Sequence, residues 1–305
     1  MRSHLFATLC LAVLTGACGG GLQLTLIDAS VQKPSNVAVY FTVDTVAGEP
    51  VAGLEATSFR IYEDDRLVSI HESQQTILSP EVAAAHYTVL LVDMSGSVVE
   101  SGDIPVIVDA ATAFANRVGK YQEIAVFAFD GGRNLIPVVN FSNSPDRLQR
   151  GIARLADIRT RDPSTNLNGA VIEAMRKLDR QVARARVPLR FGTLVVFTDG
   201  SDRAARVPRE ALYDAVEQSE YDVLVIGVGA EIDDAELSAI GKSGVISNKD
   251  RAEIASSFEQ AARRVEAFSR RYYLLGYCSP SRAGVHKVRI EAEFEGRTGE
   301  LLYEF

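Results

Sequence analysis

The sequence is poor in the residues that carry several familiar kinds of protein chemistry. Its 305 residues include three cysteines, four histidines and no tryptophan. Three cysteines cannot build the disulfide framework that stabilises many small secreted domains. No Cys and His residues have the spacing of a zinc site, and no Gly-x-Ser-x-Gly nucleophile elbow is present. The sequence therefore offers neither a zinc finger nor the usual motif of a serine hydrolase.

Positive charge is also scarce. Lys and Arg total 32 against 40 Asp and Glu, which gives a net charge of −8. Nucleic-acid binding depends on neutralising phosphates with a surplus of Lys and Arg, so we expect no nucleic-acid partner. The composition, 47% hydrophobic and 24% charged, is that of a globular protein and excludes a disordered tail or a coiled-coil rod.

The N-terminal apolar segment is too short to span a membrane. It covers residues 5–14 and follows a single positive charge, Arg2. A spanning helix needs about 20 apolar residues, whereas a basic start before a short apolar core is typical of a secretory signal. We therefore predict that residues 1–17 are a signal peptide. An ordinary secretory signal cut near Ala17 is one alternative, and a lipoprotein signal is the other.

The end of this segment favours the lipoprotein signal. Residues 14–18 (LTGAC) resemble the cleavage box of bacterial lipoproteins, which implies cleavage before Cys18 and a lipid on its sulfur. Residues 18–21 would then be the lipidated cysteine and a glycine tether. Gly19 stands where Asp would signal retention, which implies the outer membrane of a Gram-negative bacterium. The expected protein is exported and lipid-anchored.

The rest of the chain divides into three parts by its apolar pattern. Residues 22–85 contain short strand-like runs separated by turn residues, and residues 272–305 show the same character. Residues 86–271 alternate strands with helical segments, among them 104–118 and 252–271, which favours an α/β doubly wound, mostly parallel sheet. We expect this unit to be inserted in, or flanked by, a small β-sandwich of the N- and C-terminal strands. A C-terminal hairpin packed on the α/β unit is the alternative.

Several oxygen-bearing side chains follow the predicted strands of the α/β unit. Asp93-x-Ser95-x-Ser97 comes directly after the apolar run 86–92, Thr165 lies in a loop that enters a helix, and Asp199 follows another apolar strand. The carboxyl ends of parallel strands share one edge of a sheet, where ligands bind. A set of oxygens alone suits a hard cation such as Mg²⁺ or Ca²⁺. The sequence therefore predicts a metal site at this edge.

These five residues resemble the complete metal-ion-dependent adhesion site of the von Willebrand factor type A domain. The similarity covers residues 86–271, and looser flanking motifs resemble those of bacterial secreted proteins with this domain. The resemblance implies that the hydroxyls of Ser95, Ser97 and Thr165 bind the metal. It implies that Asp93 and Asp199 act largely through water. It also implies Mg²⁺ as the cation, with Ca²⁺ or Mn²⁺ as alternatives.

The ligand set also implies a function. Neutral hydroxyls donate little negative charge, so the cation keeps an open, electrophilic position, which a partner protein's Asp or Glu fills in that family. The expected protein is a membrane-anchored, extracytoplasmic adhesion or scaffolding module, with no enzymatic activity and no small-molecule substrate. Two alternatives stay open. One is an envelope-assembly protein in which the metal only orders loops, and the other is a metal-assisted hydrolase with Asp130 or Asp202 as its base.

Three further features have structural interpretations. Residues 63–65 (EDD) are expected to form a solvated turn, and Cys278 to be a small residue at a strand end. Arg270 and Arg271 fall at the end of the last predicted helix, where cations complement the helix dipole.

Overall fold

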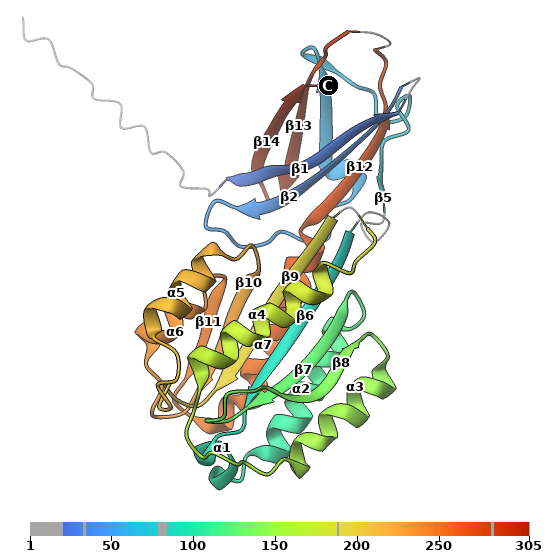
Figure 1. Cartoon of the computed structure of the whole chain (residues 1–305). Coiled ribbons are helices and arrows are strands. Elements are labelled where there is room, and N and C mark those ends of the chain that lie inside the picture. Colours follow the sequence, from blue (N-terminus) through green and yellow to red (C-terminus); the bar gives the residue numbers. More distant parts are fainter. Residues whose placement is uncertain (1–20, 33–34, 79–83, 188, 282–283, 305) are drawn as a thin grey trace, which may run out of the picture.

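A computed structural model of the chain describes residues 21–32, 35–78, 84–187, 189–281 and 284–304 (Figure 1). The predicted signal peptide and Cys18 lie outside the described residues. The described part consists of an α/β unit with a six-stranded sheet and a smaller unit with two four-stranded sheets. Within the described ranges, no helix has the length and apolar character needed to cross a membrane.

The six-stranded sheet has the order β11-β10-β9-β6-β7-β8. Its strands are β6 (Ala84–Asp93), β7 (Glu123–Phe129), β8 (Ile136–Ser142), β9 (Leu189–Thr198), β10 (Asp222–Val228) and β11 (Gly244–Asn248). All neighbours are parallel except β7 and β8, which are antiparallel. Long apolar runs form the central strands because helices cover both of their faces. The predicted mostly parallel sheet is confirmed.

Helices cover the two faces of this sheet. They are α1 (Gly96–Ser101), α2 (Ile104–Val118), α3 (Pro145–Ile152), α4 (Leu167–Val182), α5 (Arg209–Gln218), α6 (Asp234–Ile240) and α7 (Ile254–Arg270). Short 3₁₀ turns are η1 (Ala56–Ser58), η3 (Ala153–Asp157) and η4 (Arg251–Glu253). Buried residues of α2, α3 and α7 pack on one face, and those of α4, α5 and α6 on the other.

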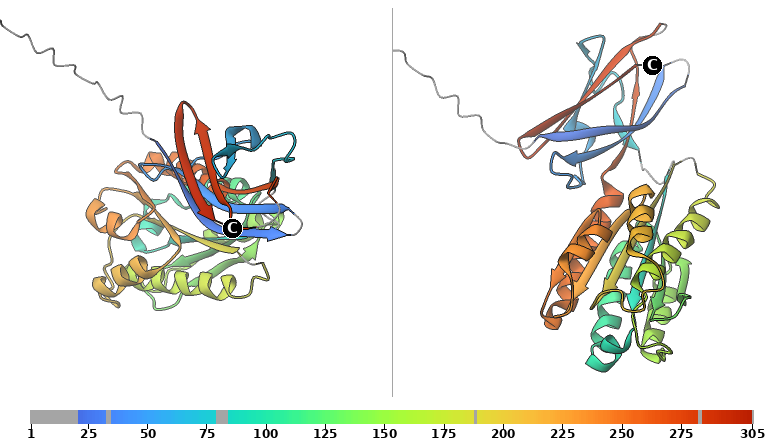
Figure 2. Two further views of the ribbon diagram at one scale, coloured as in Figure 1. Left: turned by 90° about the horizontal axis from the view of Figure 1, so that it is seen from above. Right: turned by 60° about the vertical axis from the view of Figure 1, so that its left-hand side comes forward.

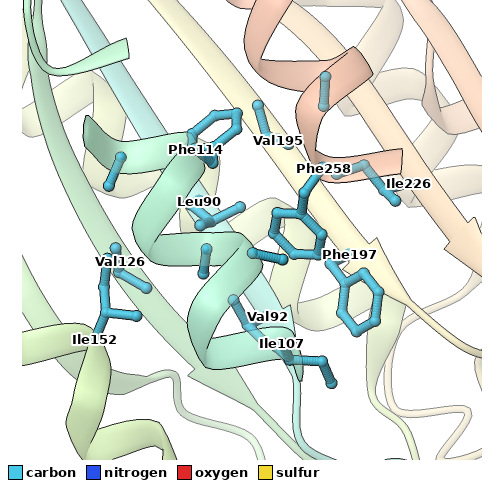
Figure 3. Packing of buried hydrophobic residues seen from close by; sticks show 14 of the residues in the cluster. Leu90, Val92, Ile107, Phe114, Val126, Ile152, Val195, Phe197, Ile226 and Phe258 are labelled. Atoms are coloured by element: carbon cyan, nitrogen blue, oxygen red, sulfur yellow. The ribbon is translucent and has the colours of Figure 1, made fainter. Parts of the chain in front are cut away.

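Alternate residues of the central strands enter opposite cores. Leu90 and Val92 of β6 pack beneath α2 and α7, whereas Val89 and Leu91 pack beneath α4. In the first of these cores the Phe258 ring of α7 lies 5.1 Å from the ring of Phe197 (Figure 3). A shift of one residue in the pairing of these strands would turn each apolar side chain toward the opposite core. Because both faces are buried, the strand register is therefore strongly fixed.

The N- and C-terminal strands build the second unit together. They are β1 (Leu22–Gln32), β2 (Asn36–Thr45), β3 (Phe59–Glu63), β4 (Arg66–Leu67), β5 (Thr76–Leu78), β12 (Tyr272–Cys278), β13 (Lys287–Phe294) and β14 (Arg297–Glu304). The two antiparallel sheets have the orders β1-β2-β12-β5 and β14-β13-β3-β4, and their inner faces share one apolar core. The C-terminal strands thus complete sheets that the N-terminal strands begin. The predicted fold class is confirmed, and the boundaries at residues 85 and 271 stay our proposal.

The turn at residues 63–65 agrees only in part with expectation. Asp64 and Asp65 are exposed and have φ values of 47° and 64°. Glu63 is buried, and its carboxylate accepts hydrogen bonds from the hydroxyls of Tyr277 (2.9 Å) and Ser279 (3.0 Å). The prediction of a solvated turn is wrong for Glu63, whose carboxylate ties β3 in one sheet to β12 and its continuation in the other.

Arg271 joins the two units. It follows α7 directly, and its guanidinium lies 3.2 Å from an oxygen of Asp44 in β2 and 3.4 Å from an oxygen of Asp222 in β10. Burial alone would lower the pKa of Arg271, but the carboxylates of Asp222 and Asp44 outweigh it and hold that pKa above its usual range. Arg271 therefore forms an ion-pair bridge between the units and does more than complement a helix dipole.

An aromatic cluster beside Arg271 fills the rest of the junction. The rings of Phe191 and Tyr272 lie 4.1 Å apart, and the His86 ring lies 5.0 Å from that of Phe191. Burial, with the nearby positive charge of Arg271, lowers the pKa of His86 to about 4. This histidine is therefore neutral in the folded protein at pH 7.

We predict an acid-sensitive stability that depends on His86. Because the folded-state pKa of about 4 lies below the usual 6.5, the unfolded chain takes up the proton first as the pH falls. The contribution of His86 is lost between pH 6.5 and 4, up to about 3 kcal/mol. Urea unfolding across this range should show a smaller loss for His86→Phe than for the wild type. The exposed His71→Asn variant should behave like the wild type, and an unchanged loss in His86→Phe would contradict the prediction.

Candidate metal centre

Two of the predicted site residues, Asp93 and Asp199, lie at the carboxyl ends of β6 and β9. These parallel strands end at the edge of the sheet that lies away from the sandwich (Figure 1; Figure 2). Their register sets Val92 opposite Phe197, so Asp93 and Thr198 come next to each other. The Thr198 hydroxyl donates a hydrogen bond of 2.7 Å to Asp93. This bond fixes the buried Asp93 carboxylate at the base of the site.

A chain of hydrogen bonds runs from Asp93 through Ser95 and Ser97 to Asp199. The other Asp93 oxygen accepts a bond of 2.9 Å from the backbone N–H of Ser95. The hydroxyls of Ser95 and Ser97 lie 3.3 Å apart, and that of Ser97 donates a bond of 2.9 Å to Asp199. The structure therefore brings four of the five predicted residues into one continuous network.

The loop that carries Thr165 packs against this network. The backbone N–H of Gly96 donates a bond of 2.9 Å to the carbonyl of Pro163. A Cβ on Gly96 would lie 2.9 Å from the Cβ of Pro163, so only glycine permits this approach. The Thr165 carbonyl accepts bonds from the backbone of Arg203 and Ala204, both of 2.9 Å.

The hydroxyl of Thr165 is left without a partner. Thr165 is 4% exposed, and no residue in the described part of the chain hydrogen-bonds its side chain. The hydroxyl oxygen is nevertheless not among the fully enclosed unpaired atoms, so it reaches solvent and is open to a ligand at the site.

The two carboxylates of the site have different environments. Burial raises the pKa of Asp93 to about 6, against the hydrogen bonds from Thr198 and Ser95 and with the help of the charge on Asp199. Asp199 instead pairs with Arg251, whose guanidinium lies 2.6 Å from its oxygen and 2.9 Å from Asp103. A bound cation would favour the ionised form of both carboxylates.

Sequence reasoning missed Arg251. Arg251 follows β11, whose carboxyl end lies at the same edge of the sheet as the site. This position after a parallel strand was the signal in the sequence that could have placed Arg251 near the site. Its charge offsets that of Asp199, so the oxygens of the site carry less net negative charge than two free carboxylates would.

The donor set fits a hard divalent cation. Among the described residues, no group of three or more His, Cys, Asp or Glu side chains is arranged to hold a metal. A site at this edge must therefore rely on hydroxyls, and the residues that would hold the cation are Ser95, Ser97 and Thr165. Mg²⁺ and Ca²⁺ both prefer such oxygen ligands.

The two candidate bases of the hydrolase hypothesis are occupied with structural contacts. The carboxylate of Asp130 accepts bonds from the backbone N–H groups of Gly132 (2.7 Å) and Arg161 (3.1 Å). That of Asp202 accepts bonds from the backbone of Asn168 (3.1 Å) and Ala205 (3.0 Å). Both carboxylates hold loops in place, and neither supports the hydrolase hypothesis.

Residues 88–265 match the von Willebrand factor type A domain. The chain belongs to this family. Domains of this family generally serve as binding and adhesion modules, which agrees with the expectation that the protein is not an enzyme. A search of curated proteins found no match to the sequence.

The chain is similar to solved structures of low sequence identity. Proximal thread matrix protein 1 from the mussel byssus is 15% identical, with a TM-score of 0.51, over 60% of this chain and 49% of that chain. A second structure of that protein, with a zinc-occupied MIDAS motif, is 14% identical, also with a TM-score of 0.51, over 60% and 48%. A von Willebrand factor type A protein from Catenulispora acidiphila is 14% identical, with a TM-score of 0.46, over 93% and 73%. The matched region spans about half of the mussel protein.

We predict that Mg²⁺ stabilises the protein through the Thr165 hydroxyl. At 100 times its dissociation constant, Mg²⁺ should add about 2.7 kcal/mol of stability, a rise of a few degrees in Tm. Thr165→Val keeps the shape of the side chain but removes the hydroxyl, and it should lose most of this rise. The matched control is Ser164→Ala, because the Ser164 hydroxyl donates to Asp162 instead. An equal rise in Thr165→Val, measured by thermal unfolding with Mg²⁺ and with EDTA, would contradict the assignment.

Proposed function

We propose that this protein is an exported, lipid-anchored binding module that recognises a partner protein through a divalent cation. Ser95, Ser97 and Thr165 hold the cation, with Asp93 and Asp199 balancing its charge, and the cation is Mg²⁺. A carboxylate of the partner, from Asp or Glu, completes the coordination. The observation that carries the proposal is the hydrogen-bonded network of Asp93, Ser95, Ser97 and Asp199, together with the Thr165 hydroxyl, which no described residue hydrogen-bonds.

The charge of the site supports a carboxylate as the incoming ligand. Three of the five residues are neutral hydroxyls, and the Asp199 carboxylate is paired with Arg251. A divalent cation held in this way keeps most of its positive charge and attracts an anionic oxygen. The zinc-occupied motif of the mussel protein supports a divalent cation in this fold.

The location that we propose rests on the N-terminal sequence. Residues 1–17 are the signal peptide, Cys18 carries the lipid, and the protein resides at the outer membrane of a Gram-negative bacterium. The first described strand, β1, begins four residues after Cys18 and belongs to the sandwich. The metal loops lie at the opposite end of the α/β unit (Figure 2), which leaves them open to a partner.

Partner binding should require the metal. Chemical crosslinking on intact cells with Mg²⁺ should recover a partner with the wild type and with Ser164→Ala. It should recover little with EDTA or with Thr165→Val, because both remove the cation that the partner's carboxylate binds. In the identified partner, one Asp→Asn or Glu→Gln change should abolish recovery. A partner recovered equally with EDTA would contradict this proposal and favour a purely structural role for the metal.

Anchoring should depend on Cys18. Cys18→Ala should abolish metabolic labelling with an alkyne fatty acid, because it removes the sulfur to which we propose the lipid is attached. It should also move the protein from the membrane fraction to the supernatant. Cys278→Ala is the matched control and should label normally. Normal labelling of Cys18→Ala would contradict the lipoprotein assignment without affecting the metal site.

A further inference from the structure

Three exposed arginines surround one side of the metal centre. Arg133 lies in the loop between β7 and β8, and Arg159 and Arg161 lie in the loop that leads to α4. All three side chains are exposed, in a chain whose net charge is −8. These loops therefore present three positive side chains to solvent although the chain as a whole is acidic.

A hydrogen bond from the side chain between them places Arg159 and Arg161 beside the site. They flank Thr160, whose hydroxyl donates a bond of 2.7 Å to the carbonyl of Met94. Met94 lies between Asp93 and Ser95 in the chain. The two arginines are therefore attached to the same loop that supplies the first hydroxyl of the site.

Arg133 is held beside Thr165 in a similar way. The carbonyl of Gly132 accepts a bond of 2.7 Å from the side chain of Asn166, the residue after Thr165. The backbone N–H of Asn166 in turn donates a bond of 3.1 Å to the carbonyl of Asp130. The loop that carries Arg133 is therefore fixed to the loop that supplies the Thr165 hydroxyl.

The charge of these arginines is not neutralised within the described structure. Two other arginines of the metal loops are ion-paired, Arg203 with Glu231 and Arg206 with Asp162. Arg133, Arg159 and Arg161 form no ion pair with any described residue. The nearby Asp130 carboxylate is occupied by backbone N–H groups, so the three guanidinium groups are available to a partner.

We infer that the partner presents an acidic segment, in which one carboxylate binds the metal and neighbouring carboxylates bind Arg133, Arg159 and Arg161. This inference rests on the proposed function and names the chemistry of its partner. Guanidinium groups recognise carboxylates with paired hydrogen bonds, and charges on the rim of an interface mainly accelerate association and provide specificity. An exposed ion pair contributes about twofold to affinity, so three contribute about tenfold.

The test uses two labelled nonapeptides, the whole chain and excess Mg²⁺. One peptide has a single Glu in a Gly-Ser background, and the other has four further Glu residues around it. We expect the wild type to bind the acidic peptide about tenfold more tightly by fluorescence anisotropy. The triple variant R133Q/R159Q/R161Q should lose this preference while its Tm still rises with Mg²⁺. The control variant R147Q/R184Q/R186Q changes three exposed arginines elsewhere on the α/β unit and should keep the preference.

The outcomes separate this inference from the proposed function. The inference is wrong if the wild type binds both peptides equally, or if the triple variant keeps the preference. It is also wrong if a nine-nucleotide single-stranded DNA binds as tightly as the acidic peptide, since the arginines would then attract any polyanion. If the wild type shows no response to Mg²⁺ and binds neither peptide, the proposed function itself fails and the inference with it.

Discussion

The register between β6 and β9 determines where the oxygens of the candidate metal site lie. Val92 faces Phe197 across these strands, so Asp93 and Thr198 end together and share a hydrogen bond of 2.7 Å. Apolar side chains fill both faces of the sheet, and a slip of one residue would turn each of them into the wrong core. The hydrophobic packing of the α/β unit therefore holds in place a site whose own groups are polar.

The candidate site combines few charges with many hydroxyls. The Arg251 pair with Asp199 reduces its negative charge further, and exposed arginines lie on one side of it. Unpaired positive charge therefore lies beside the site in a chain that is acidic as a whole. A cation at such a site remains a strong attractor of anions, which is why we propose an acidic partner rather than a polar or an apolar one.

The sandwich fixes the direction in which the metal loops face. The start of β6 and the end of α7 both lie at the sandwich end of the α/β unit, where Ala84 packs with Tyr40 and Tyr272 and Arg271 pairs with Asp44 and Asp222. Such a partly buried pair is costly to break, because removing the arginine would leave two carboxylates uncompensated. The junction is therefore a poor place for free rotation, and the loops at the other edge stay directed away from the sandwich (Figure 2).

The sequence alone determined the fold class and the five candidate metal residues, because apolar periodicity and the ends of strands are local features of the chain. The helix predicted over residues 104–118 is α2, and Asp93 and Asp199 lie at strand ends as expected. Only the tertiary structure decided the roles of Arg251, Arg271 and Glu63, since the partners of each lie far away in the chain. Which partners they meet depends on how strands and helices pack. The sequence around a charged residue in a loop or turn does not distinguish a solvated side chain from a paired or a buried one.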